Sequence, residues 1–143
     1  MTLRAARMMK RRTTQRDAIQ KVIQERDRAL NAEEILHAAR RVVDSLNQST
    51  VYRNLKLLVE KGWLRKINHP ARGPLYERAD KNHHHHFHCR SCNKVYELPG
   101  CILNENASTP QGFVTEKHEV FLFGVCFSCQ TEVDDGENTY PSP

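Results

Sequence analysis

The sequence predicts an α+β protein of two small domains: an N-terminal winged helix-turn-helix and a small C-terminal α/β domain with two Cys-x-x-Cys knuckles. Three observations predict this fold class. Three helical patterns followed by two short strand patterns fill the first half of the chain. Histidines and cysteines, the ligands that zinc prefers, gather in the second half. The charge also changes sign between the halves, which indicates two different jobs.

The first two helices are expected within residues 13–43. The basic segment 1–12 contains no acid, and a mobile arm, a short helix near phosphate and a solvated tail all remain open for it. Thr14 is a favourable N-cap residue, so the first helix is expected to begin there. Asn31 and Glu34 have the spacing of a capping box and predict the start of the second helix. The expected inward side chains are Ala18, Ile19, Val22 and Ile23, then Ile35, Leu36, Ala39, Val42 and Val43.

A third helix is expected over 48–61, because Gly62 suits the position just after a helix. Its apolar stripe comprises Val51, Leu55 and Leu58, and its opposite face carries Tyr52, Arg53 and Lys56. A helix that buries one side and presents Tyr, Arg and Lys on the other is suited to a DNA groove. A merely solvated amphipathic helix is the alternative, and the basic charge of this half disfavours it.

Two short strands are expected after this helix, over 63–67 and 75–77, with the Pro/Gly-containing segment 69–74 as the turn between them. Three helices and a hairpin make a winged helix-turn-helix. We therefore expect a DNA-binding domain at residues 1–78 and a polar hinge at 79–82. A metal-binding domain at 83–130 and a disordered acidic tail at 131–143 complete the expected organisation.

The charge asymmetry indicates contact with a polyanion. Residues 1–72 hold 17 Lys/Arg and 7 Asp/Glu, whereas residues 73–143 hold 5 and 10. No apolar run approaches the length of a membrane span, and the N-terminus lacks the apolar stretch of a secretory signal. Cysteines paired beside histidines suit metal binding in a reducing compartment. We expect a cytoplasmic protein without a membrane partner.

The run from His83 to Cys92 holds five of the eight histidines and two of the five cysteines. Because side chains alternate along a strand, His84, His86 and His88 would share one face, and His83 and His85 the other. One strand could therefore supply ligands to two metal sites. A purification-tag remnant is disfavoured, since the run adjoins Cys-x-x-Cys in mid-chain.

The two Cys-x-x-Cys pairs predict a structural zinc site. The expected ligands are Cys89, Cys92, Cys126 and Cys129, with 33 residues between the pairs. Four thiolates close the tetrahedral shell of zinc and leave no position for a substrate. Strands are expected at 86–90 and 94–98, a short helix at 101–108, and one or two further strands within 112–125. Cys101 is expected to be an ordinary thiol.

Four motifs carry a resemblance: Ser49-Thr-Val-Tyr-Arg53, the His-rich run before Cys89-Arg-Ser-Cys92, Lys94-Val-Tyr-Glu97, and His118 followed by Gly124-Val-Cys-Phe-Ser-Cys129. With these motifs in this order, residues 13–130 resemble the ferric uptake regulator family of bacterial metal-responsive repressors. The resemblance implies a homodimer that pairs through its C-terminal dimerisation domains. Each protomer would present one winged helix to half of a palindromic operator in double-stranded DNA.

The resemblance also implies site residues. The regulatory metal ligands would be Glu77, His84, His86 and Glu97, and a second metal site would use His83, His85, Glu105 and His118. The DNA contacts would come from Arg16, Thr50, Tyr52, Arg53 and Lys56. The chain departs from the family where Ala29 replaces a histidine ligand, with His69 as a substitute, and where the acid of the second site falls on Asn104, beside Glu105. The missing histidine also weakens a peroxide-sensing interpretation.

These observations predict a metal-dependent transcriptional repressor of metal homeostasis genes, with a structural zinc and a regulatory Fe²⁺, Zn²⁺ or Mn²⁺. The alternative is a zinc-ribbon and winged-helix adaptor that binds protein partners without metal-switched DNA binding. A zinc enzyme is disfavoured, because the sequence contains no His-Glu-x-x-His and no deaminase signature. We therefore expect no enzymatic activity and no small organic substrate.

Overall fold

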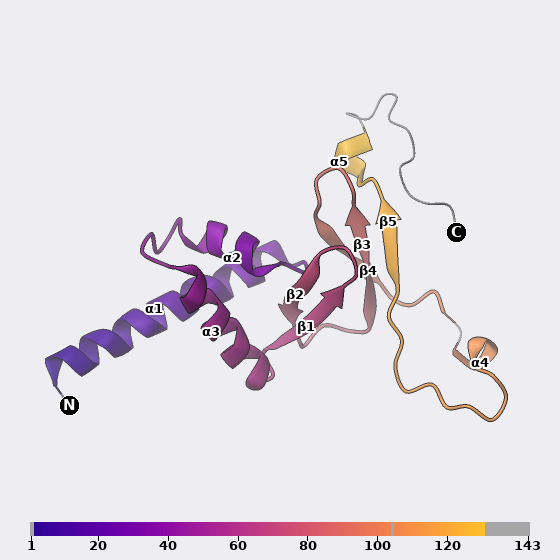
Figure 1. Cartoon of the computed structure of the whole chain (residues 1–143), viewed down its shortest axis with the longest axis horizontal. Coiled ribbons are helices and arrows are strands. Elements are labelled where there is room, and N and C mark those ends of the chain that lie inside the picture. Colours follow the sequence, from indigo (N-terminus) through magenta and orange to yellow (C-terminus); the bar gives the residue numbers. More distant parts are fainter. Residues whose placement is uncertain (1, 104, 131–143) are drawn as a thin grey trace. The chain divides into compact units, whose positions relative to one another are not determined.

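The computed structural model describes residues 2–103 and 105–130 and divides the chain into two units, Met1–His84 and His85–Pro143 (Figure 1). The boundary between the units falls inside a strand, a few residues after the hinge expected at 79–82. The acidic tail expected at 131–143 lies outside the described residues. None of the helices in the described part is long and apolar enough to cross a membrane.

The first helix, α1 (Leu3–Arg26), begins much earlier than expected. Its N-cap is Thr2, whose hydroxyl accepts a hydrogen bond from the Ala5 N–H at 3.3 Å. The prediction of Thr14 as the N-cap is wrong: its hydroxyl donates to the Lys10 carbonyl at 2.8 Å inside the helix. The basic segment is rich in Ala, Met, Arg and Lys and has no Gly or Pro, so nothing stops the helix from extending through it.

The second helix, α2 (Ala32–Ala39), begins with the predicted capping box. The Glu34 N–H donates to Asn31 Oδ1 at 2.8 Å, and the Asn31 N–H donates to Glu34 Oε2 at 3.0 Å. Because the helix ends at Ala39, Val42 points outward and is 67% exposed, so its expected inward position is wrong. Val43 does pack against the core.

The third helix, α3 (Gln48–Glu60), has Asn47 as its N-cap and buries the predicted stripe of Val51, Leu55 and Leu58. Gly62 follows the helix at φ 75°, the left-handed conformation that glycine adopts at no steric cost. The three helices pack around a single core in this unit, which includes Ile19, Ile35 and Leu46.

The wing is an antiparallel hairpin of β1 (Leu64–His69) and β2 (Gly73–Arg78). Both strands are longer than predicted and the turn is correspondingly shorter, with His69 opposite Gly73. Tyr76 ties the hairpin to the helices, because it exchanges backbone hydrogen bonds of 2.7 and 3.0 Å with Leu30. The winged helix-turn-helix predicted from the sequence is confirmed.

The second unit is built on a three-stranded sheet of order β4-β3-β5. Strand β3 (His84–Cys89) is central and pairs in parallel with β5 (Phe121–Gly124), placing Phe87 opposite Leu122. Strand β4 (Val95–Pro99) follows a turn, and two short helices, α4 (Glu105–Ser108) and α5 (Phe127–Gln130), complete the unit. The sequence did not predict α5, which carries part of the second knuckle.

This second unit has a very small apolar core. Among its described residues, the buried apolar side chains are Cys89, Val95 and Cys129. A domain with so little buried apolar surface needs another source of stability, such as a bound metal or a partner chain.

Candidate metal centres and nucleic-acid interface

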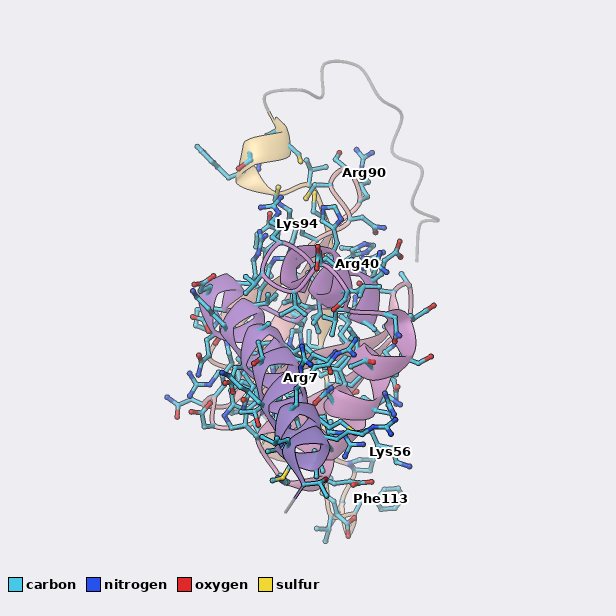
Figure 2. The ribbon with its side chains drawn as sticks, turned by 90° about the vertical axis from the view of Figure 1, so that its left-hand side faces the viewer. Arg7, Arg40, Lys56, Arg90, Lys94 and Phe113 are labelled. Carbon is cyan, nitrogen blue, oxygen red and sulfur yellow. The ribbon has the colours of Figure 1, made fainter. Side chains whose placement is uncertain are left out.

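The exposed face of α3 carries most of the predicted DNA contacts. Tyr52 is 47% exposed, and Arg53 and Lys56 are also exposed. Figure 2 labels Lys56 on α3 and Arg7 on α1, and both residues are exposed. A duplex presents one negative charge about every 1.7 Å of its axis, so such side chains suit its phosphates.

Thr50 and Arg16 occupy supporting positions beside this face. The Thr50 side chain is buried, and its hydroxyl oxygen accepts a hydrogen bond from Arg53 Nη2 at 3.3 Å. Arg16 donates to Asn54 Oδ1 at 3.4 Å, and Asn54 donates in turn to the Thr50 carbonyl at 2.8 Å. In this structure Thr50 therefore orients Arg53 rather than forming part of the open face.

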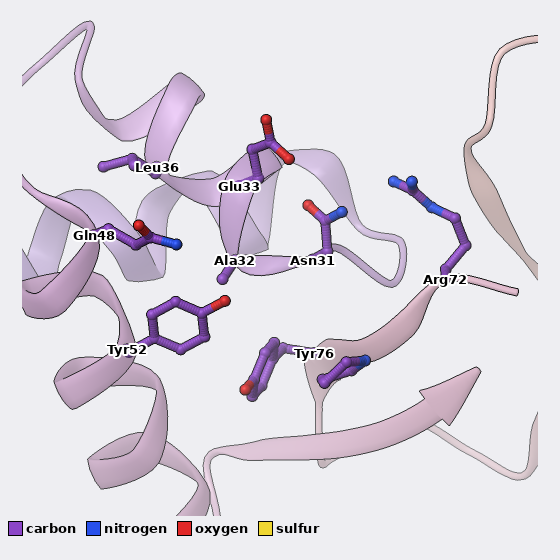
Figure 3. A pocket seen from close by; sticks show the side chains of 9 residues that line it. Asn31, Ala32, Glu33, Leu36, Gln48, Tyr52, Arg72 and Tyr76 are labelled. Carbon is purple, nitrogen blue, oxygen red and sulfur yellow. The ribbon is translucent and has the colours of Figure 1, made fainter. Parts of the chain in front are cut away.

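A pocket of about 360 Å³ lies between α2, α3 and β2 (Figure 3). Tyr52 and Tyr76 line it from α3 and β2, and Asn31 and Glu33 line it from the start of α2. The half-exposed ring of Tyr52 therefore borders open space.

The four paired cysteines come together in the second unit. The sulfurs of Cys89, Cys92, Cys126 and Cys129 all lie within 4.8 Å of one another, and Cys92 Sγ is 3.9 Å from Cys126 Sγ. Zinc–sulfur bonds of about 2.3 Å at tetrahedral angles separate two sulfurs by about 3.8 Å. The donor set and its spacing therefore fit zinc.

Hydrogen bonds to the sulfurs of Cys89 and Cys126 favour the thiolate form. Burial raises the pKa of Cys89, but hydrogen bonds from the backbones of Cys126 and Cys92 outweigh it and lower the pKa to about 6. Burial likewise raises the pKa of Cys126, and hydrogen bonds from the Cys129 backbone and the Tyr96 hydroxyl lower it overall. Two effects raise the pKa of Cys129 to about 12: the hydrogen bond with the Cys126 side chain is the larger, and burial is the smaller. A bound dication would hold all four sulfurs as thiolates.

Tyr96 is a member of this centre that the sequence analysis did not single out for a role. Its hydroxyl lies 3.8 Å from Cys92 Sγ. Burial is the main cause that raises the pKa of Tyr96, and hydrogen bonds with Cys126 and Cys92 raise it further. The phenol therefore keeps its proton and can donate a hydrogen bond to thiolate sulfur. Two sequence signals pointed to it: its position four residues after Cys92 and its place in the motif Lys94-Val-Tyr-Glu97.

Glu77 and His84 form a buried pair at the end of the first unit. His84 Nε2 lies 2.9 Å from Glu77 Oε2, and His84 Nδ1 lies 2.7 Å from the Asn82 carbonyl oxygen. A carbonyl only accepts, so Nδ1 carries a proton. Nε2 therefore faces a carboxylate that also only accepts, and a second proton or a cation must lie between the two atoms. Arg65 also binds Glu77, through Oε1.

The remaining residues of the predicted regulatory set are placed as follows. His86 follows His84 by two residues on β3 and is buried, and Glu97 is half-buried on β4, the neighbouring strand. His69 is buried in the wing turn, where its Nδ1 accepts the backbone N–H groups of Ala71 and Arg72 at 3.1 Å. The role of His69 as a substitute ligand for Ala29 stays a prediction.

The second predicted metal site contains an unexpected side chain, Cys101, beside its histidines. His85 Nε2 and His118 Nε2 each lie 3.2 Å from Cys101 Sγ. The sequence assigned the fourth position to Glu105, whose side chain lies outside the described part of the structure. The sequence predicted an ordinary thiol at Cys101. It could not indicate these partners, because they are 16 and 17 residues away and no local pattern links them to Cys101.

The chain is similar in sequence to a known family of proteins. The sequence profile of the ferric uptake regulator family matches residues 8–123. The ferric uptake regulation protein of Campylobacter jejuni is 30% identical over 125 residues, which are 84% of this chain and 80% of the relative. The zinc uptake regulation protein of Mycobacterium tuberculosis is 30% identical over 124 residues, which are 85% of this chain and 95% of the relative.

Solved structures give a similar result. A zinc-bound manganese uptake regulator superposes with a TM-score of 0.69 at 25% identity, covering 78% of this chain and 87% of that one. The ferric uptake regulator of Helicobacter pylori, described as having three functional metal-binding sites, superposes with a TM-score of 0.65 at 27% identity, covering 95% and 93%.

Proposed function

Since the chain belongs to the ferric uptake regulator family, we propose that a divalent ion held by Glu77, His84, His86 and Glu97 switches its affinity for DNA. The family consists of metal-responsive, DNA-binding transcriptional regulators, and this protein is a metal-dependent regulator of that kind. The ligand set, the operator and the metal identity are the parts that we propose.

The observation that carries the proposal is the buried contact between His84 Nε2 and Glu77 Oε2. Because the Asn82 carbonyl fixes the proton on Nδ1, the Nε2 atom is oriented as a metal ligand in the way that second-shell carbonyls orient histidines. In the absence of metal a proton can occupy the place between the two atoms. A divalent ion would release that proton and bind both side chains.

The position of the pair explains how the ion could act on DNA binding. Glu77 lies on β2 of the wing, and Arg65, its partner on β1, lies directly opposite in the hairpin register. His86 and Glu97 belong to the strands of the second unit. Ligands drawn from both units would hold the DNA-binding domain at one angle, and a dimeric helix-turn-helix protein requires one spacing between its recognition helices, about 34–36 Å or a multiple.

We further propose that the protein acts as a homodimer on a palindromic operator. Strand β5 is at one edge of its sheet, and its Leu122 and Phe123 are 41% and 40% exposed. Exposed apolar side chains on an edge strand suit pairing with a second copy of the chain. Two copies related by a two-fold axis would place two α3 helices on two related half-sites.

The proposed cofactors are one structural zinc on the four cysteines and one regulatory iron(II) or zinc. Nitrogen and oxygen donors accept iron(II), manganese(II) and zinc, whereas four thiolates favour zinc. Relatives are described as ferric, zinc and manganese uptake regulators, which supports a divalent metal without selecting one. We place the protein in the cytoplasm, where a reducing environment keeps thiol ligands available.

The experiment is a gel-retardation assay with protein that retains its structural zinc, a palindromic duplex, and added iron(II), manganese(II) or zinc. We expect one or more of these ions to strengthen binding, and the affinity to fall steeply with salt, because phosphate contacts release counterions. Absence of retardation under every divalent ion would instead favour a protein-binding adaptor.

A further inference from the structure

We propose that Cys101, as a thiolate, binds a metal ion together with His85 and His118, and that this site takes zinc or a similarly thiophilic divalent ion in preference to iron(II) or manganese(II). The site is separate from the Glu77–His84 switch, and its test requires no DNA. The ligand set that the sequence predicted consists of three histidines and one carboxylate. The proposed set differs from it because the sulfur of Cys101 replaces the carboxylate oxygen.

The geometry of the three side chains supports coordination. Both imidazole Nε2 atoms lie 3.2 Å from Cys101 Sγ, and the rings of His85 and His118 have centroids 5.0 Å apart. Zinc–sulfur bonds of about 2.3 Å and zinc–nitrogen bonds of about 2.05 Å at a tetrahedral angle separate nitrogen from sulfur by about 3.5 Å. A shift of a few tenths of an ångström would therefore admit the ion.

The Cys101 sulfur is surrounded by nitrogen atoms. The Leu103 N–H donates to Cys101 Sγ at 3.4 Å, whereas the thiol's own acceptor, the Leu103 carbonyl, is farther away at 3.7 Å. Together with the two imidazoles, the sulfur has three nitrogen atoms within 3.4 Å. A thiolate is both the stronger hydrogen-bond acceptor and the metal ligand.

The chemistry of sulfur sets the preference for the ion. Soft thiolate ligands select zinc and related metals, while carboxylates and waters suit manganese and magnesium. His83, two residues before His85 in the sequence, is the candidate for a fourth ligand and would complete the four-coordinate shell that zinc prefers. Binding would release the thiol proton of Cys101 to solvent.

The position of the proton on the His85 ring distinguishes the metal-free form of the site from the metal-bound form. In this structure the Val120 N–H donates to His85 Nδ1 at 3.2 Å, so the proton of a neutral ring is on Nε2, facing the sulfur. An ion at Nε2 requires that proton to be on Nδ1, where it opposes the Val120 N–H. We therefore expect metal binding to break this hydrogen bond and to change the Val120 amide signal.

The place of the three ligands in the chain gives the site a structural consequence. His85 lies on the central strand β3, Cys101 follows β4 by two residues, and His118 precedes β5 by three. The ion would fasten both ends of the long connection 101–118 to the central strand. Restricting such a connection lowers its conformational entropy and should slow its local opening.

The test uses full-length protein with its structural zinc in place, titrated with cobalt(II), whose thiolate complexes absorb in the near ultraviolet. We expect one cobalt equivalent to produce this thiolate-to-cobalt absorption, and Cys101→Ser to abolish it while weakening binding by roughly tenfold or more. His118→Ala should also weaken binding. Cys101→Asp should bind without the absorption and with a relative gain for manganese(II). Exposed His37→Ala on α2 is the matched control and should behave as wild type.

A second readout does not depend on a variant that may fold poorly. Cys101 is exposed, so iodoacetamide should alkylate it, and added zinc should slow that reaction by roughly tenfold or more if the thiolate is a ligand. Mass spectrometry of the alkylated peptide and the Val120 amide resonance report the same event. A thiolate absorption that persists in Cys101→Ser, or an alkylation rate that zinc leaves unchanged, would overturn the proposal.

Discussion

His84 Nε2 lies 2.9 Å from Glu77 Oε2, and both side chains are only 1% exposed. Two such acceptor-capable atoms stay in contact away from water only with a cation or a proton between them. Glu77 belongs to strand β2 of the wing, and His84 is the first residue of β3. The proton or cation between these two side chains therefore links the wing to β3. The predictions below follow from this pair and from the other centres.

Replacing Glu77 by Gln tests the pair with little change in shape. The amide keeps the volume of the side chain but loses the charge that attracts a divalent ion. We expect regulatory metal affinity to fall by roughly ten- to a hundredfold, measured calorimetrically with the structural zinc retained. Glu33→Gln, an exposed carboxylate on α2, is the matched control. Equal metal affinities for Glu77→Gln and wild type would contradict the assignment.

Replacing Cys92 by Ser should remove the structural zinc and unfold the second unit. The few buried apolar side chains of that unit cannot stabilise it alone, and structural zinc sites contribute about 10 kcal/mol or more to folding in small peptides. Zinc content, circular dichroism and sedimentation measure the outcome. Cys101→Ser should instead keep this zinc. A folded, dimeric and zinc-free Cys92→Ser protein would refute the site.

The α3 surface predicts distinct effects on DNA binding. Arg53→Ala and Lys56→Ala should weaken binding, and loss of one phosphate contact should lower the logarithmic salt slope by about one. Tyr52→Ala should cost about 1–3 kcal/mol if the ring reads a base, and should relax specificity at one position of the operator. Fluorescence anisotropy at several salt concentrations distinguishes these effects. Lys117→Ala, an exposed charge in the second unit, should leave affinity unchanged.

The capping box of α2 makes a prediction about stability. Asn31→Ala removes the acceptor of the Glu34 N–H and should destabilise the first unit by about 0.5–2 kcal/mol. Denaturant unfolding measures the change, with exposed Asn68→Ala on β1 as a control. If the two variants were equally stable, the cap would contribute nothing.

The sequence predicted those features that depend on local spacing. The capping box and the buried stripe of α3 depend on residues three or four apart, and both are confirmed. The prediction of Thr14 as an N-cap was wrong because threonine, a good capping residue, also fits inside a helix. There its hydroxyl donates to the carbonyl four residues earlier. A cap can be recognised from sequence only if the preceding residues resist helix formation, and those of segment 1–12 do not.

The sites show the same limit at longer range. The strand alternation correctly indicated different partners for neighbouring histidines, because His84 meets Glu77 whereas His85 meets Cys101. The identity of those partners depends on how the chain returns to β3. His69 is only one residue farther from Glu77 in the sequence than His84 is, yet its Nδ1 accepts hydrogen bonds from the wing turn. Sequence distance therefore could not rank the ligands.

The most direct test of the switch measures how metal changes the affinity for a palindromic duplex in wild type and in His84→Ala/His86→Ala, both retaining the structural zinc. An ion that favours the DNA-binding arrangement by about 3–5 kcal/mol shifts its population decisively. We expect iron(II) or zinc to strengthen wild-type binding, and the double variant to remain a folded dimer whose weak binding no ion improves. His37→Ala should respond as wild type does. Metal-stimulated binding that survives in the double variant would contradict the account and move the switch away from Glu77 and His84.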